Sequence, residues 1–282
     1  MTTSVTSDSA RAARSGLVLY LVAVVALSAP LQVGIILTDA FAQIASAIAW
    51  LFGLMLVPTV ASVMARLARS EGFADLGLRR GQGVGRALVI AVVHPFLVGA
   101  VAYGLAWVTG LTELRSLPLG GWAALFAAML VLNSLLSTGE ELGWRGYLLP
   151  HLVEAGVPHP VLVSSLVWAL WHVPLFLWGG FVQDGPHPVT TTVLMLTGAT
   201  ALGYVLGRLR LDSGNVWPAA VLHIVWNTVI QTGFDPVTGG DDKALWTGET
   251  GILTVLTLVA VAVAYRQVPP RASRPFEVVA AP

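Results

Sequence analysis

The 282-residue sequence contains no cysteine and few charged residues. Without cysteine, the chain has no disulfides, no thiolate nucleophile and no cysteine-ligated metal. Asp, Glu, Lys and Arg make up 11% of the chain, whereas soluble domains contain about 25%. The formal net charge is zero, which argues against nucleic acid as a partner. Because 56% of the residues are hydrophobic, the composition excludes a soluble domain and favours an integral membrane protein.

Long apolar segments follow one another along most of the sequence. About 20 apolar residues cross the core of a bilayer, and by this criterion we predict about eight transmembrane helices. They lie at 16–37, 42–64, 87–109, 121–141, 161–179, 190–207, 216–234 and 250–265. The predicted fold is therefore all-α, a polytopic helix bundle (16–265) in the cell membrane. The polar segment 1–15 and the proline-rich tail 266–282 are predicted to be disordered and cytoplasmic.

The basic residues predict the orientation of this bundle, because cytoplasmic loops collect Arg and Lys. With a cytoplasmic N-terminus, only Arg115 and Lys243 fall on the far side, and all the other basic residues fall on the cytoplasmic side. Both termini are therefore predicted to be cytoplasmic. The loops 180–189 and 235–249 on the far side are acidic instead. All basic residues but one are Arg, and together with abundant Ala, Val and Gly this favours a bacterial source.

Three polar motifs interrupt the predicted membrane helices, each with its polar residues one helical turn apart. They are Glu140-Glu141-x-x-x-Arg145, Trp168-x-x-x-His172 and His223-x-x-x-Asn227. A charged group in hydrocarbon costs roughly 2.5–3.5 kcal/mol, so it persists where it is paired, lines a wet cavity or does chemistry. Three such motifs on three spans indicate a common active site.

The first motif separates two carboxylates by their position on a helix. Glu141 and Arg145 are four residues apart, so they can pair on one helical face. Glu140 is rotated by about 100° and can point toward the interior of the bundle. We predict that Glu141 is held by the arginine and that Glu140 is free to act as a general base. The alternative is an arginine that clamps both acids at a membrane edge.

The other two motifs have simpler explanations when each is taken alone. A lone His172 in an apolar helix is more often a packed, hydrogen-bonded residue, and Asn227 can bridge helices as a polar contact. Along straight helices Glu140 lies nearer the cytoplasmic end than His172. The side chains therefore meet only in a tilted bundle or around a cavity, which we expect to open toward the cytoplasmic side.

In their order and spacing, the three motifs resemble those of the CAAX-protease and bacteriocin-processing family (CPBP, also called Abi), which includes the Ras-converting CAAX endopeptidase. The stretches EELGWRGYLLP (140–150) and SSLVWALWHVP (164–174) are similar to those of bacterial members. The resemblance covers roughly residues 130–232. It departs from the family pattern at Trp168, where the family has Phe.

The resemblance implies an intramembrane endopeptidase with a protease core at about 121–234. Its substrate would be a membrane-associated or lipidated peptide or protein. Glu140 would activate a water molecule with the help of His172. His223 and Asn227 would bind the developing oxyanion. The residues that would support this site are Glu141, Arg145 and Trp168.

A requirement for metal stays open at this stage. Family members are usually described as metalloproteases, although this chain has no H-E-x-x-H motif. Glu140, His172 and His223 can supply a zinc set of two histidines and one carboxylate. We favour water activated by the glutamate alone.

Functions of other classes remain as alternatives. The main one is a non-catalytic membrane scaffold or bacteriocin-immunity-type protein that keeps the same fold. A serine protease using Ser134 or Ser137 lacks the expected nucleophile turn, and a transporter lacks the expected internal repeats. Loss of catalysis on Glu140→Gln distinguishes an enzyme from a scaffold.

Overall fold

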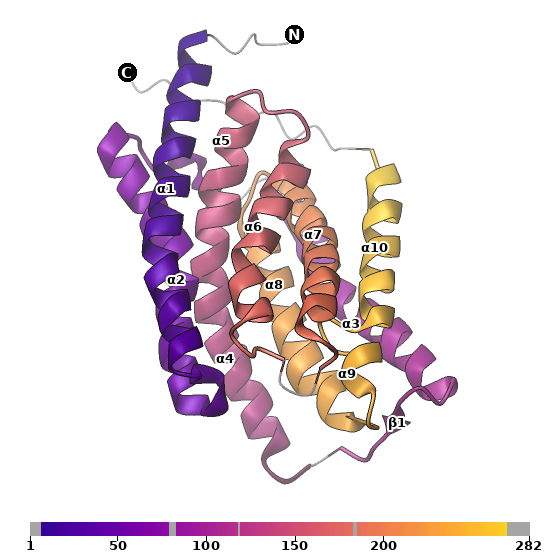
Figure 1. The fold of residues 1–282 in the computed structure, drawn as a ribbon. Helices are drawn as coiled ribbons and strands as arrows, with labels where there is room; N and C mark the ends of the chain where they lie inside the picture. Colours follow the sequence, from indigo (N-terminus) through magenta and orange to yellow (C-terminus); the bar gives the residue numbers. More distant parts are fainter. Residues whose placement is uncertain (1–6, 79–82, 118, 183–184, 270–282) are drawn as a thin grey trace.

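The computed structural model describes residues 7–78, 83–117, 119–182 and 185–269, and most of them are helical. The principal helices run roughly side by side and alternate in direction (Figure 1). They are α1 (Ser7–Leu37), α2 (Ile44–Arg69), α3 (Val84–Val108), α4 (Leu119–Gly143), α5 (Leu149–Glu154), α6 (Pro160–Leu177), α7 (Pro188–Ser213), α8 (Trp217–Val229) and α10 (Ile252–Gln267). The all-α prediction is confirmed for these residues.

The two ends of the bundle differ in the segments that they contain. The termini end holds the start of α1, the end of α10 and helix α5 (Figure 1). The loop end holds the turn η1 (Ala40–Ala42) and the short helix α9 (Lys243–Trp246). It also holds a small antiparallel sheet, in which Glu113 of β1 (Glu113–Leu114) pairs with Gly239 of β2 (Thr238–Gly239).

Two helices continue through π-helical turns. The turn η3 (Trp144–Leu148) joins α4 to α5, and the turn η4 (Ile230–Phe234) extends α8 toward the single turn η5 (Asp235–Val237). The predicted span 121–141 is therefore too short, since the helical segment reaches Glu154. Pro150 does not stop it, because a proline in the first turn of α5 gives up a backbone N–H that α5 itself does not need.

Six helical segments in the described part of the chain are long and apolar enough to cross a membrane. They are Asp8–Leu37, Ser46–Arg69, Val84–Val108, Gly120–Glu154, Pro160–Leu177 and Pro188–Ser213. These six correspond in order to the first six of the eight predicted spans. Helix α10 is apolar but shorter, and α8 is not among the six.

The predicted disordered ends need a correction. Helix α1 begins at Ser7, so residues 7–15 are helical rather than disordered. Alternating small and long residues with no glycine before position 16 allow α1 to extend past its apolar stretch. At the other end α10 runs to Gln267. Residues 1–6 and 270–282 lie outside the described residues.

The outward faces of the helices are apolar, and several charged side chains are buried in the interior. Val25, Val93, Leu170 and Leu256 are 66%, 52%, 57% and 60% exposed, whereas charged side chains such as Arg145 are fully buried. Large exposed apolar surfaces need a lipid environment or a partner. Together with the six long apolar helices, this surface indicates a membrane location.

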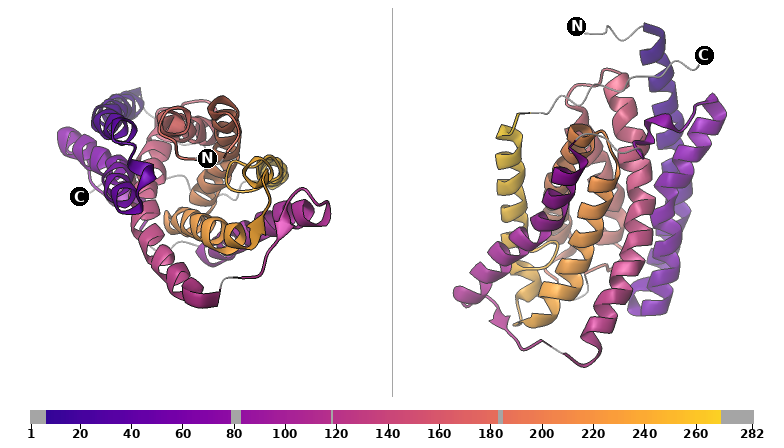
Figure 2. Two further views of the ribbon diagram at one scale, coloured as in Figure 1. Left: turned by 60° about the horizontal axis from the view of Figure 1, so that its bottom comes forward. Right: turned by 180° about the vertical axis from the view of Figure 1, so that it is seen from behind.

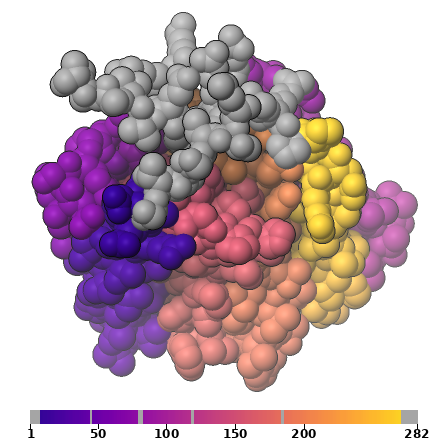
Figure 3. All heavy atoms as spheres, turned by 90° about the horizontal axis from the view of Figure 1, so that it is seen from above, coloured from indigo at the N-terminus to yellow at the C-terminus, as the bar shows by residue number. Residues whose placement is uncertain are grey.

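The bundle is shown tilted so that the loop end comes forward and from behind in Figure 2, and from the termini end in Figure 3. The three views agree on the order in which the helices pack. Helices α1 and α2 form one flank and α10 lies on the opposite flank, with α5 and α6 between them. The segment after α2 folds back on this end through η2 (Ala74–Leu76). There Asp75 accepts a hydrogen bond from Arg66 (Nη2–Oδ2 2.9 Å).

Close packing of α2 against α4 depends on Gly143, because a methyl group there would overlap the backbone of Pro58. We expect Gly143→Ala to lower the free energy of unfolding by about 1–3 kcal/mol, the usual cost of overpacking. Thermal unfolding of the purified protein in detergent, followed by its helical circular dichroism, measures the change.

The matched control is Gly104→Ala in α3, where a methyl group would meet no heavy atom within 4 Å. Its melting temperature should stay unchanged or rise, because alanine favours a helix over glycine by roughly 0.5–1 kcal/mol. Equal melting temperatures for the two variants would contradict the close contact at Pro58.

Candidate active site

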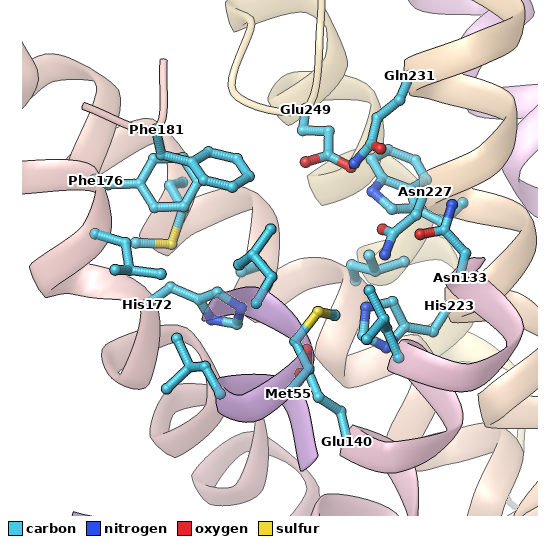
Figure 4. A pocket seen from close by; sticks show the side chains of 18 of the residues that line it. Met55, Asn133, Glu140, His172, Phe176, Phe181, His223, Asn227, Gln231 and Glu249 are labelled. Carbon is cyan, nitrogen blue, oxygen red and sulfur yellow. The ribbon is translucent and has the colours of Figure 1, made fainter. Parts of the chain in front are cut away.

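A cavity of about 300 Å³ lies inside the bundle between α2, α4, α6, α7 and α8 (Figure 4). Most of its lining is apolar. The polar groups in the lining include the four predicted catalytic residues, Glu140, His172, His223 and Asn227. In Figure 4 the two histidines face the cavity from opposite sides, with Glu140 between them. The structure therefore brings together side chains that straight helices would hold at different heights.

Glu140 is held by two indole groups. Its side-chain oxygen Oε2 accepts hydrogen bonds from Nε1 of Trp168 (2.7 Å) and from Nε1 of Trp144 (3.3 Å). The residue is only 1% exposed, and its other oxygen, Oε1, has no hydrogen-bond partner among the described residues. The carboxylate is thus fixed in orientation and still presents one oxygen to the cavity.

Glu141 forms the centre of a fully buried ion pair. Its Oε1 accepts from Nη1 of Arg145 at 2.7 Å and from Nδ1 of His223 at 3.0 Å. Both members of the Glu141–Arg145 pair are 0% exposed. The prediction that Arg145 holds Glu141 on one helical face is confirmed, and the contact with His223 is an additional role that the spacing did not reveal.

Arg145 also connects the pair to neighbouring helices. Its Nη2 donates to the carbonyl oxygen of Gly203 in α7 (3.4 Å), and its guanidinium carbon lies 4.8 Å from the centre of the Trp168 ring. A guanidinium over an indole face is attracted by the ring electrons. Trp168 therefore contacts Arg145 through its face and Glu140 through its N–H, which a phenylalanine at this position would not do.

Hydrogen bonds on Nδ1 determine which nitrogen each histidine offers to the cavity. Nδ1 of His172 lies 2.8 Å from the carbonyl oxygen of Trp168. A carbonyl oxygen only accepts, so Nδ1 carries the proton and Nε2 of the neutral ring is free to accept one. Nδ1 of His223 likewise donates to the carboxylate of Glu141. For Nε2 of His223 to donate as well, the ring must be the imidazolium.

Carboxamide groups supply the remaining polar lining on this side. Nδ2 of Asn227 lies 3.4 Å from the hydroxyl oxygen of Ser137. Nδ2 of Asn133 donates to the hydroxyl of Thr228 at 3.1 Å. Asn227 lies one turn after His223 on α8, and both line the cavity. Ser137 is a partner of Asn227 and lies outside the cavity lining, which gives no support to a serine nucleophile.

The residues proposed for zinc do not form a ligand set as arranged. In the described part of the chain, no group of three or more His, Cys, Asp or Glu side chains could hold a metal ion. One oxygen of Glu140 is occupied by two indoles, and Nδ1 of His223 by Glu141. We therefore derive no step through a metal.

The motifs did not reveal three further polar residues of the site. Trp144 is four residues after Glu140, and this helical spacing was the available signal. Gln231 and Glu249 line the cavity farther toward the loop end, where Nε2 of Gln231 donates to Oε1 of Glu249 (3.1 Å). Glu249 lies in a loop, and burial raises the pKa of its carboxyl to about 7. Nothing in the local sequence around Glu249 indicates this position.

The cavity lies toward the loop end. The ranges that line it are 47–55 in α2, 168–176 in α6, 195–202 in α7 and 223–231 in α8 and η4. In these four helices the lining comes mainly from the half nearer the loop end (Figure 1), whereas in α4 the lining residues 129–140 lie mainly in the half nearer the termini end. The sequence predicts both cytoplasmic termini and a cytoplasmic opening of the site. Both stay predictions, because the position of the cavity does not assign a side of the membrane to either end of the bundle.

Comparison with known families agrees with this geometry. Residues 119–229 match the family described as Type II CAAX prenyl endopeptidase Rce1-like. The matched segment begins at α4, ends with α8 and includes all three motifs. No curated protein matches the chain. The resemblance predicted from the motifs is thereby confirmed over residues 119–229.

Proposed function

We propose that the protein is a multi-pass intramembrane endopeptidase that hydrolyses a peptide bond of a membrane-associated or lipidated peptide or protein. The observation that carries the proposal is the buried carboxylate of Glu140. Two indoles hold one of its oxygens, while the other faces a cavity shared with His172, His223 and Asn227. A fixed base beside donors for developing negative charge is what amide hydrolysis requires.

Glu140 and His172 activate the attacking water. Oε1 of Glu140 and Nε2 of His172 are both free to accept a proton, so the water can be held by one and deprotonated by the other. Its oxygen bonds to the substrate carbonyl carbon, and its proton passes to Glu140. The protonated Glu140 then gives this proton to the amide nitrogen as the carbon–nitrogen bond breaks. The products are a carboxyl group and an amine, and Glu140 is regenerated.

His223 and Asn227 stabilise the tetrahedral intermediate. The amide N–H₂ of Asn227 and the imidazolium Nε2–H of His223 donate to the oxyanion as its charge develops. Removing one such donor from an oxyanion hole typically costs about 10²–10³-fold in kcat. Glu141 and Arg145 act through His223, because their ion pair fixes the orientation of its ring.

The same proposal includes the topology. Helix α8 with η4 and helix α10 are taken as the seventh and eighth crossings, although they fall short of the length or hydropathy of the other six. Their alternating direction supports this assignment (Figure 1). Both termini are then on one side of the membrane, and the arginines exposed at the termini end support a cytoplasmic location for that side.

Replacing the base tests the proposal. We expect Glu140→Gln to abolish cleavage of a membrane-soluble fluorogenic peptide panel, because the amide cannot take a proton from water. The carboxamide keeps the size of the side chain, so the melting temperature should change little. The measurement is turnover by purified protein in detergent, with Glu113→Gln on the exposed strand β1 as the control that retains activity.

Two other results of this experiment separate the alternatives. Equal turnover by wild type and Glu140→Gln would sink the proposal and leave the membrane scaffold. We expect a chelator to leave wild-type turnover unchanged, in keeping with water activated by glutamate alone. Loss of turnover on chelation, restored by added zinc, would instead assign Glu140, His172 and His223 to a metal.

The indole of Trp168 should contribute to catalysis through its N–H. We expect Trp168→Phe to lower kcat/KM about tenfold, the effect of losing one hydrogen bond to a charged group while Trp144 keeps the second. Trp178→Phe is the control, because Trp178 is 65% exposed. Identical kcat/KM values for wild type and Trp168→Phe would show that the indole N–H is not needed to hold Glu140.

A further inference from the structure

We propose that Thr59, Arg66 and Arg210 are positioning residues of the active site. They bind backbone carbonyls before and after Glu140, hold the turn η3, and through it fix the indole of Trp144 that orients the carboxylate. This inference rests on the proposed protease function. It extends the site beyond the three motifs, because Thr59 and Arg66 belong to α2, which precedes the matched residues 119–229.

The turn η3 carries side chains that hold both glutamates of the first motif. Its first two residues are Trp144 and Arg145. Nε1 of Trp144 donates to Glu140, and Nη1 of Arg145 donates to Glu141. The backbone N–H of Leu149 bonds to the carbonyl of Trp144, five residues earlier, so the turn departs from the regular helical repeat. The directions of both side chains therefore depend on how this turn is held.

Two buried arginines bind the backbone of η3. Nε of Arg210, in α7, donates to the carbonyl oxygen of Arg145 at 3.0 Å. Nη2 of Arg66, in α2, donates to the carbonyl oxygen of Gly146 at 3.2 Å. Arg210 is 0% exposed and Arg66 is 1% exposed. Because a buried charge is costly unless its donors are paired, these contacts resist separation and hold η3 from two neighbouring helices.

Asp75 joins the two arginines to each other. Its carboxylate accepts from Nη1 and Nη2 of Arg66 at 2.5 and 2.9 Å. Its carbonyl oxygen accepts from Nη2 of Arg210 at 2.7 Å. A bidentate contact between a guanidinium and a carboxylate restricts the orientation of both groups. Arg66, Asp75, Arg210 and the two carbonyls of η3 thus form one connected set of hydrogen bonds, which we call the clamp.

Helix α2 also binds the backbone before Glu140. Oγ1 of Thr59 donates to the carbonyl oxygen of Gly139, which directly precedes Glu140. Thr59 and Arg66 are seven residues apart, and so are their acceptors Gly139 and Gly146. Seven residues are about two helical turns, so α2 contacts the catalytic segment at matching heights. The segment that contains Glu140 is therefore held on both sides by the same helix.

The three positioning residues act at a distance from the substrate. The described residues that line the catalytic cavity do not include Thr59, Arg66 or Arg210. These side chains therefore influence the reaction through the orientation of Glu140 and not through contact with bound peptide. A misoriented base slows the chemical step, whereas binding of the substrate in its ground state is unaffected. The effect of losing the clamp should appear in kcat rather than in KM.

Replacing one arginine of the clamp tests this inference. We expect Arg210→Met to lower kcat for peptide cleavage about tenfold with KM within about twofold. Methionine fills much of the same space and cannot donate to the carbonyl of Arg145. The matched control is Arg208→Met on the same helix. Arg208 is 6% exposed and donates to the carbonyl of Val268 directly after α10 (3.0 Å), so kcat of this variant should match wild type.

A double-mutant cycle separates positioning from a general loss of stability. If Arg210 acts through Trp144, Arg210→Met should cost less than about threefold in kcat when Trp144→Phe is already present, because coupled residues are not additive. In a Trp168→Phe background it should still cost about tenfold, since this second indole reaches Glu140 from α6. Equal losses in the two backgrounds would overturn the positioning role.

Hydrogen–deuterium exchange in detergent measures the clamp without turnover. Arg210→Met should speed exchange of the amides of residues 144–149 about tenfold or more, because local opening of η3 becomes easier. Arg208→Met should leave these rates unchanged. Thr59→Val removes one hydroxyl at nearly constant shape, and it should lower kcat about threefold even if Arg210→Met does not fold.

Failure of this inference differs from failure of the protease function. Equal exchange rates in wild type and Arg210→Met would overturn the clamp, whether or not the protein is active. A wild-type kcat for Arg210→Met and Thr59→Val, in a protein that Glu140→Gln inactivates, would overturn positioning and leave the protease intact. Equal turnover by wild type and Glu140→Gln would remove the protease function and the positioning role with it.

Discussion

The buried ion pair between Glu141 and Arg145 is the interaction on which the site depends. Breaking a buried pair by removing one partner costs about 3–5 kcal/mol, because the other charge is left without compensation. In this bundle the pair also has a geometric role. Glu141 fixes the ring of His223, and Arg145 binds the backbone of Gly203. The end of α4 and the turn η3 are thereby held against α7 and α8 around the cavity.

Trp168 connects this ion pair to the carboxylate of Glu140, the proposed base. Its ring face lies against Arg145, and its N–H holds Glu140. The ring centroid also lies 5.3 Å from the centroids of His172 and His223. One side chain therefore contacts both histidines, the ion pair and the proposed base. Each of these contacts is specific in direction, so rotation of the indole would disturb all of them together.

Much of the fold and of the site could be predicted from the sequence. Hydropathy predicts the successive apolar helices, because lipid selects apolar outer surfaces regardless of the packing partner. The i, i+4 spacing of Glu141 and Arg145 predicts their pairing, since helical geometry alone brings them together. The contact of Trp168 with Glu140 was not predictable in this way. It joins α6 to α4 across the bundle, and depends on how two helices are rotated against each other.

Two π-helical turns are a second reason why some side-chain positions could not be predicted from the sequence. The π-helical turn η3 begins directly after Gly143, and η4 begins three residues after Asn227. A π-helical turn inserts an extra residue into the helical repeat and re-aims the side chains after it, and it often occurs at functional sites. Extrapolation of the regular 3.6-residue repeat through these turns misplaces the residues that follow them.

The apolar lining of the cavity limits where water can bind near Glu140. Hydrolysis consumes one water for each bond, and a cavity lined mainly by leucine, methionine and aromatic side chains offers water few partners. Among the polar exceptions, the carboxamides of Asn133, Asn227 and Gln231 lie on one wall. Water and peptide backbone need the same donors and acceptors. The wall that offers donors and acceptors to a peptide backbone is therefore also the wall that can bring water to Glu140.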